Sequence, residues 1–319
     1  MVKLAFAFAG QGAQYAGMGE PFYDAYASVR GLFDQAERQR PGITELCFKG
    51  PAEALGETLN TQPAMFLADL ASALALRESG IEAAGAAGFS LGEIPALAYT
   101  GIMEPAKAFE FVCFRAQVMQ EAAKRHPGGM LAVLKLTAGQ VEELCSTLPE
   151  AFAVNYNCPG QTVVACSEDA LQDVQAAIAQ AGGKCLRLAV SGAFHSPLMD
   201  EASTAILAHL QGWADEGLQA PRIPLFSNVT AMPYGDPRAL LAAQVNHPVL
   251  WQASVEHMLA AGYEAFVEVG PGQVLSGLIK KIVEKAKKDG ALEAGRDVRV
   301  LNVNDLGSLA ECVKELEHA

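Results

Sequence analysis

The chain has 319 residues, of which 51% are hydrophobic and 18% charged, a composition typical of a folded globular protein with one large core and a smaller domain. Its formal net charge of −13 argues against nucleic acid as a partner, because neutralising phosphates requires a basic face. The seven cysteines are odd in number, scattered and without a Cys-x-x-Cys pair. The sequence therefore predicts neither a disulfide framework nor a metal site.

The apolar stretch near the N-terminus is too short to be a membrane segment. It runs from Leu4 to Ala9, which is shorter than the apolar region of a signal peptide. No later apolar run is long enough to span a bilayer. The sequence therefore predicts a cytoplasmic protein with reduced thiols and no membrane partner.

Strands alternate with helices along most of the chain, a pattern typical of an α/β protein with a parallel sheet. Three of the later strands are predicted in "IPLFSNVT" from residue 223, "AFVEVG" from 265 and "VRVLNVN" from 298. The elements predicted before residue 126 are a strand at Leu4–Ala9, helices at Pro21–Glu37 and Gln62–Glu78, a strand at Ala83–Phe89, and a helix from Pro105 to about Lys124.

The middle of the chain has a different order of elements. A strand at Met130–Leu136 leads into a capping box, Thr137 and Gln140, that begins a helix. A hairpin turn separates two short strands, "AFAVNYN" and "QTVVAC". Ser167 is then predicted to cap a second helix. A last strand is indicated by the alternation of Leu186, Leu188 and Val190.

This β-α-β-β-α-β order is that of a ferredoxin-like α+β subdomain. We place the subdomain at residues 127–191. It is inserted into a discontinuous large α/β domain made of residues 1–126 and 192–319.

Residues 87–95 read "AGFSLGEIP", so that Ser90 lies between Gly88 and Gly92. A Gly-x-Ser-x-Gly stretch is typical of a nucleophile elbow, where a strand turns sharply into a helix and exposes a serine hydroxyl. The glycines are expected because the backbone passes close to itself on both sides of the serine and leaves no room for a Cβ atom. The five-residue pattern alone is also compatible with an ordinary tight turn.

A nucleophilic serine needs a base, and His195 has the most suitable setting among the six histidines. It lies in the loop "SGAFHSPLM", after the last strand of the inserted subdomain. The other histidines lie near predicted helix ends, on polar faces or, for His247, before a proline. Ser90 and His195 are therefore the candidate nucleophile and base.

A series of short motifs runs in order along nearly the whole chain: "FAGQGAQ", "NTQPAMF", "GFSLGE", "FRAQVMQE", "YNCPGQTVVA", "GAFHSPLM", "FSNVTA", "QVNHPVLW" and "EVGPGQVLSGL". Together they resemble the malonyl-CoA:acyl carrier protein transacylases. In the first motif, Ala9 replaces the family's proline. The resemblance implies a parallel-sheet, hydrolase-like α/β core with the inserted ferredoxin-like α+β subdomain.

The resemblance also implies roles in the chemistry of acyl transfer. Ser90 would attack the thioester, and His195 would take the serine proton as general base and later protonate the departing thiol. The backbone N–H groups of Gln11 and Leu91 would form the oxyanion hole.

Two further roles concern binding and orientation. Arg115 would hold the malonyl carboxylate, since a planar guanidinium that makes two charge-assisted hydrogen bonds selects a carboxylate over acetyl or longer apolar chains. Before the motif is considered, the alternative is that Arg115 is an ordinary arginine on a helix surface. Gln244 would orient His195 through its carbonyl, so that no third carboxylate is required.

The implied reaction moves malonyl from malonyl-CoA to the phosphopantetheine thiol of acyl carrier protein through a malonyl-serine intermediate, by a ping-pong mechanism. It would supply extender units for fatty-acid or polyketide synthesis. Malonyl-CoA and acyl carrier protein are thus the expected partners. The coenzyme A thioester is a substrate, no cofactor is expected, and the enzyme is expected to be a monomer.

Two aromatic residues bear on acyl selectivity. Phe89 stands where the family usually has a histidine, immediately before the serine, which removes a polar neighbour from the mouth of the pocket. Phe194, immediately before His195, matches the malonyl-selective members of the family.

Two other functions compete with this interpretation. A serine hydrolase would use the same elbow, but its usual order is Ser, acid, His. Glu168 and Asp169 lie between Ser90 and His195, but both fall in the inserted region rather than at a sheet end. A non-catalytic scaffold that docks carrier proteins is disfavoured because all the reactive groups are present.

Three other features have ordinary alternatives. The lysines between Lys280 and Lys288 form the densest basic cluster, which is either a docking site for an acidic ligand or a solvated helix face. The segment Gly270–Gly272 is interpreted as a plain turn. "GQGAQY" lacks the third glycine of a dinucleotide loop, because Tyr15 stands there, and the nearest candidate acid, Asp34, falls inside a predicted helix.

Overall fold

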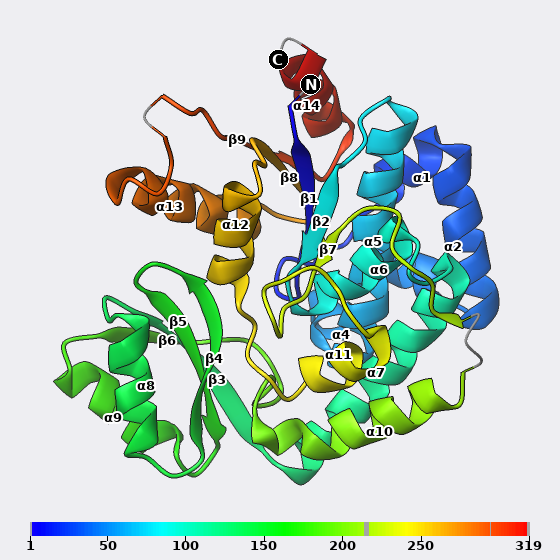
Figure 1. The fold of residues 1–319 in the computed structure, drawn as a ribbon. Helices are drawn as coiled ribbons and strands as arrows, with labels where there is room; N and C mark the ends of the chain where they lie inside the picture. The colour runs from blue at the N-terminus through cyan, green and yellow to red at the C-terminus, as the bar shows by residue number, and fades with distance from the viewer. Residues whose placement is uncertain (1, 214–216, 294, 318–319) are drawn as a thin grey trace.

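The computed structural model describes residues 2–213, 217–293 and 295–317, and two sheets organise this part of the chain (Figure 1). One is a five-stranded parallel sheet with the order β7-β2-β1-β8-β9, and the other a four-stranded antiparallel sheet with the order β4-β5-β3-β6. The predicted fold class, a parallel α/β core with a separate α+β unit, is confirmed. None of the described helices combines the length and apolarity needed to cross a membrane.

The parallel sheet brings distant segments of the chain side by side at the carboxyl ends of its strands. In its register Phe8 lies beside Gly88 and Val269, so β1, β2 and β8 all end there. Loops that follow these strands therefore meet beyond these ends. The strands of the sheet are β1 (Leu4–Phe8), β2 (Gly85–Gly88), β7 (Leu225–Phe226), β8 (Ala265–Val269) and β9 (Arg299–Val303).

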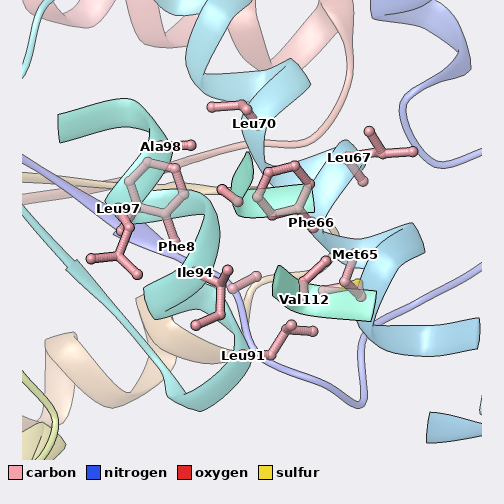
Figure 2. Close-up of a cluster of buried hydrophobic side chains, with 14 of the residues drawn as sticks. Phe8, Met65, Phe66, Leu67, Leu70, Leu91, Ile94, Leu97, Ala98 and Val112 are labelled. Atoms are coloured by element: carbon pink, nitrogen blue, oxygen red, sulfur yellow. The ribbon is translucent and has the colours of Figure 1, made fainter. Parts of the chain in front are cut away.

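Side chains of β1 alternate between two cores. Phe6 and Phe8 face a cluster with α5, α6 and α7, part of which Figure 2 shows, whereas Ala5 and Ala7 face a second cluster with α12 and α13. Large residues on one face and small ones on the other set how closely each helix layer approaches the sheet. The helices of this domain are α1 (Glu20–Ala25), α2 (Ala27–Gln39), α3 (Ile43–Lys49), α4 (Ala52–Gly56), α5 (Thr58–Glu78), α6 (Glu93–Thr100), α7 (Pro105–Arg125), α10 (Asp200–Gln211), α11 (Pro237–Gln244), α12 (Trp251–Ala260), α13 (Val274–Lys288) and α14 (Leu306–Glu317).

The antiparallel sheet has helices α8 and α9 packed on one face, and it forms the lower left part of Figure 1. All its strands lie within the segment 127–191 for which the inserted subdomain is predicted. The predicted capping box at Thr137 and Gln140 is present at the start of α8. The elements are β3 (Gly128–Leu134), α8 (Ala138–Ser146), β4 (Ala151–Cys158), β5 (Gln161–Ser167), α9 (Leu171–Gln180) and β6 (Lys184–Arg187).

Two predictions in this subdomain are wrong in detail. Ser167 does not cap the second helix: α9 begins at Leu171 with Ala170 as its N-cap, and the Ser167 hydroxyl accepts the Ala170 N–H at 3.3 Å. The last strand ends at Arg187, before Leu188 and Val190. Leu188 and Val190 line a cavity, whereas Leu186, within the strand, is exposed.

Helices of the large domain also differ from the prediction. The helix predicted at Pro21–Glu37 is two helices separated by Tyr26, whose backbone is extended (φ −117°). Arg30 of the second helix donates to the Tyr23 and Asp24 carbonyls at the end of the first, which satisfies acceptors that a continuous helix would use itself.

Helix α5 begins at Thr58 rather than at Gln62 and contains Pro63. Since proline has no N–H, the carbonyl of Leu59 loses its helical donor, and the Arg40 guanidinium bonds it instead. The proline is thus accommodated, and Gln62 lies inside a buried helix.

Candidate active site

The nucleophile elbow has the geometry that its two glycines predict. Ser90 follows β2, starts a 3-10 turn at Ser90–Gly92, and has φ +53°, a left-handed conformation uncommon outside glycine. A Cβ at Gly88 would lie 2.2 Å from the Gly92 and Glu93 backbone, and one at Gly92 would lie 2.2 Å from the Phe8 carbonyl oxygen. Only glycine fits at either position, and Ser90 lines a cavity.

Asn228, which follows the neighbouring strand, stabilises this elbow through two hydrogen bonds. Its Oδ1 accepts the Ser90 backbone N–H at 2.7 Å, and its Nδ2 donates to the Gly88 carbonyl at 2.6 Å. Asn228 follows β7, which pairs with β2. The side chain therefore closes the sharp turn and offsets the strain of the left-handed serine.

His195 lies against the serine in the arrangement of a general base. Its Nε2 is 2.7 Å from Ser90 Oγ, and its Nδ1 is 2.8 Å from the backbone carbonyl oxygen of Gln244. Because a carbonyl only accepts, the proton resides on Nδ1, and Nε2 is left to accept the serine proton. Burial and the charge of Arg115 lower the pKa of His195 to about 4, so the imidazole is neutral at physiological pH.

Arg115 extends from α7 into the same cavity and is only 1% exposed. Its Nη1 donates to Gln62 Oε1 at 2.7 Å and its Nη2 to Gln244 Oε1 at 2.8 Å, while its Nε has no partner. Burial lowers the pKa of Arg115 to about 10, which still leaves it charged. The helix-surface alternative is therefore wrong. Among the described residues, no carboxylate forms an ion pair with it.

These groups surround a cavity of about 270 Å³ between the two sheets. Gln11, from the loop after β1, and Leu91, the residue after the serine, both line it, as the predicted oxyanion hole requires. The inserted subdomain contributes an apolar wall and two buried asparagines, Asn155 and Asn157, whose Oδ1 atoms have no partner. Further lining residues are Gln62, Phe89, Met119, Met130, Ala132, Val163, Leu188, Phe194, Leu275 and Leu278.

Phe89 packs where the family usually has a histidine. Its ring meets Trp251 edge to face, with centroids 5.6 Å apart. A Cβ at Gly10 would lie 2.9 Å from Phe89 Cδ1, so the ring also lies against the loop that leads to Gln11. Phe89 thus lines the cavity, packs against its neighbours through apolar contacts and offers no charge to a ligand.

The structure leaves the other candidate residues outside the cavity. Glu168 pairs with Arg187 at 2.8 Å on the surface of the inserted subdomain, so it does not orient His195. The lysines of α13 are exposed, and Lys285 pairs with Asp289. Within the described ranges, no group of three or more metal-ligating side chains comes together.

Three polar residues that contact Ser90, Arg115 or their partners were not predicted individually, although each lies in a quoted motif. Gln62 and Glu93 are buried polar residues in apolar helices, and Asn228 follows the end of a parallel strand. A polar residue in such a place is the available signal, because burying it requires a specific partner.

The fold and the site together define an acyltransferase, and comparison with known proteins agrees. Residues 5–302 match the acyl transferase domain family, and the chain belongs to that family. It is 37% identical to the malonyl CoA-acyl carrier protein transacylase of Escherichia coli (strain K12), over 89% of this chain and 94% of the relative. The transacylase family that the motifs resemble is thereby confirmed.

Solved structures show the same similarity. A malonyl CoA-acyl carrier protein transacylase from Clostridium perfringens superposes with a TM-score of 0.90 at 34% identity, covering 99% of this chain and 98% of the other. A malonyl-transacylase in complex with a type II polyketide acyl-carrier protein has a TM-score of 0.89 at 30% identity, covering 98% and 99%.

Proposed function

We propose that this enzyme transfers malonyl from malonyl-CoA to the phosphopantetheine thiol of acyl carrier protein through a malonyl ester of Ser90. The observation that carries the proposal is a serine–histidine pair that shares a cavity with a buried, charged arginine. The pair supplies covalent acyl chemistry. The charged guanidinium favours binding of an acyl group that carries a carboxylate.

In the first half of the reaction, Ser90 Oγ attacks the thioester carbonyl carbon as its proton passes to His195 Nε2. The carbonyl oxygen becomes an oxyanion, which the N–H groups of Gln11 and Leu91 would stabilise. Collapse breaks the carbon–sulfur bond, and the imidazolium returns the proton to the departing coenzyme A sulfur.

The second half runs the same steps in reverse with a new thiol. The thiol of acyl carrier protein would give its proton to His195 and attack the malonyl ester, which releases Ser90. One site thus serves both substrates in turn, which is a ping-pong mechanism. Asn155 and Asn157 offer unpartnered amide oxygens to N–H groups of the pantetheine arm that both thiol substrates, coenzyme A and acyl carrier protein, carry.

Transfer to a thiol is favoured over hydrolysis because the base is oriented by a backbone carbonyl and the cavity walls are mostly apolar. No step requires a cofactor. We further propose that the enzyme is a monomer. The seven scattered cysteines, none of which is in a disulfide, support a cytoplasmic location.

The proposal is tested by weighing the intact protein after incubation with malonyl-CoA. We expect a stable malonyl adduct that disappears when holo acyl carrier protein is added. Free malonate without an adduct would indicate a hydrolase, and an unchanged protein would indicate a scaffold.

Replacing Arg115 by alanine is expected to reduce the malonyl-to-acetyl ratio of catalytic efficiencies. Losing a charged hydrogen-bonded pair costs about 1.5–3 kcal/mol, which is roughly a tenfold to more than a hundredfold loss of malonyl efficiency. Acetyl-CoA has no carboxylate, so its poor efficiency should stay unchanged or improve. Arg115→Lys keeps the charge but not the planar guanidinium that can make two hydrogen bonds, so it should give an intermediate ratio. Full malonyl preference in Arg115→Ala would mean that the carboxylate is bound elsewhere.

Charge reversal on α13 is expected to weaken the use of acyl carrier protein. Leu275 and Leu278 of this helix line the cavity, and Lys280 and Lys281 follow them directly on its exposed face. Lys280→Glu with Lys281→Glu should raise the Michaelis constant for the acidic carrier protein and weaken its salt dependence, with coenzyme A kinetics nearly constant. Lys314→Glu, on α14, is the control. Equal effects on both substrates, or on neither, would exclude a docking surface here.

A further inference from the structure

Glu93 is a buried carboxylate for which the proposed reaction has no use. It is the first residue of α6 and has no exposed surface. Its Oε1 accepts the Tyr234 hydroxyl, and its Oε2 accepts the Asn228 backbone N–H at 3.0 Å and Gln244 Nε2 at 3.3 Å. Each oxygen thus has a donor, which is the requirement for keeping a carboxylate in a core.

Gln244 links Glu93 to Arg115. The amide Nε2 of Gln244 donates to Glu93 Oε2 and to the Ser90 carbonyl at 2.7 Å. With its N–H groups directed at these two acceptors, the amide must present Oε1 to Arg115, as observed. Glu93 and Ser90 together therefore fix the orientation in which Gln244 holds the guanidinium.

The negative charge of Glu93 also interacts with the positive charge of Arg115. Among the described residues, the guanidinium bonds only neutral glutamine oxygens. The Coulombic interaction between Glu93 and Arg115 favours the charged form of both. Before substrate binds, one buried cation is therefore balanced by one buried carboxylate.

We propose that Glu93 is a positioning residue that serves as the resident counter-charge of Arg115 and takes up a proton from solvent when the acyl carboxylate of the substrate binds. The inference rests on the proposed function. A second carboxylate at Arg115 would leave two negative charges beside one positive charge in a buried site. Protonating Glu93 restores the balance, because like charges in a shared site raise each other's pKa.

The surroundings of Glu93 bring its pKa close to neutral pH. Burial raises the pKa of Glu93 to about 7, against the opposing effects of the Tyr234 hydroxyl, the Asn228 N–H, the Gln244 amide and the Arg115 charge. Of these groups, Arg115 on α7 and Tyr234 in the loop after β7 are titratable, whereas the Gln244 amide on α11 and the Asn228 N–H are neutral donors. A further negative charge at Arg115 moves this pKa upward, so proton uptake should be largest just above it.

The test measures proton uptake on binding by calorimetry in two buffers of different ionisation enthalpy, at a pH about one unit above the Glu93 pKa of about 7. The protein is the Ser90→Ala variant, which binds without reacting, and the ligands are malonyl-CoA and acetyl-CoA. They share the coenzyme A phosphates, so their difference isolates the acyl carboxylate. We expect more protons to be taken up with malonyl-CoA, and this excess to vanish when Glu93→Gln is added.

An excess that is absent, or that persists with Glu93→Gln, would overturn the inference. Tyr234→Phe is the second variant, in case Glu93→Gln does not fold. It removes a donor to the carboxylate and should move the pH of maximum uptake upward, and an unmoved maximum would also contradict the proposal. Formation of the malonyl adduct by the wild-type enzyme is recorded separately, so the proposed function can stand while the counter-charge inference fails.

Discussion

Ser90→Ala is expected to abolish the malonyl adduct while leaving the fold intact. The substitution removes one oxygen from a residue that lines the cavity, so no packed core is disturbed. The left-handed backbone is held by Asn228 through the residue 90 N–H and the Gly88 carbonyl, and both remain in the variant. Intact mass after incubation with malonyl-CoA should show unmodified protein, with an unchanged thermal unfolding midpoint.

The matched control is Ser191→Ala, which removes a different hydroxyl, one that bonds Thr58 rather than His195. This variant should form the adduct at the wild-type rate. A malonyl adduct on Ser90→Ala would show that another nucleophile is in use.

His195→Ala is expected to slow acylation by roughly two to four orders of magnitude, the usual range for a lost general base. The imidazole is the group within reach of the serine proton, at 2.7 Å. The measurement is the single-turnover rate of adduct formation. A change of less than about tenfold would assign the base elsewhere.

The pH dependence of the wild-type rate tests the same role. The base must be neutral to accept a proton, and the pKa of His195 is lowered to about 4 by burial and by Arg115. Acylation should therefore stay constant as the pH falls from neutrality and decline only as it approaches that value. A decline centred near the ordinary histidine value of about 6.5 would show that the imidazole is solvated.

Local patterns were sufficient to predict the elbow and the class of fold. Gly88, Ser90 and Gly92 are close in sequence, and their geometry depends on sterics that any strand-to-helix turn imposes. The capping box at Thr137 likewise depends on residues three apart. Such features form from neighbours in sequence, so the sequence alone predicts them.

The network behind the serine depends on contacts between distant segments. Glu93 meets Tyr234 and Gln244 only because β7, α6 and α11 pack together. The side-chain role of Gln244 was also missed, since the motif predicted only its carbonyl. Periodicity identifies a buried face, but it does not identify the partner that a polar side chain meets there.

The break in the helix at Tyr26 has a similar cause. Nothing in the residues between Pro21 and Glu37 stops a helix locally, and the sequence therefore predicts a continuous one. The Arg30 side chain, which bonds the carbonyls at the end of α1, stabilises the break by a tertiary contact.

The most direct test of the central claim is a transfer reaction with purified enzyme, malonyl-CoA and holo acyl carrier protein, in which the carrier protein is weighed and free malonate is measured together. The proposal predicts that malonyl–acyl carrier protein forms in step with the release of coenzyme A, that little malonate appears, and that Ser90→Ala forms no product. Release of malonate with the carrier protein unmodified would contradict it.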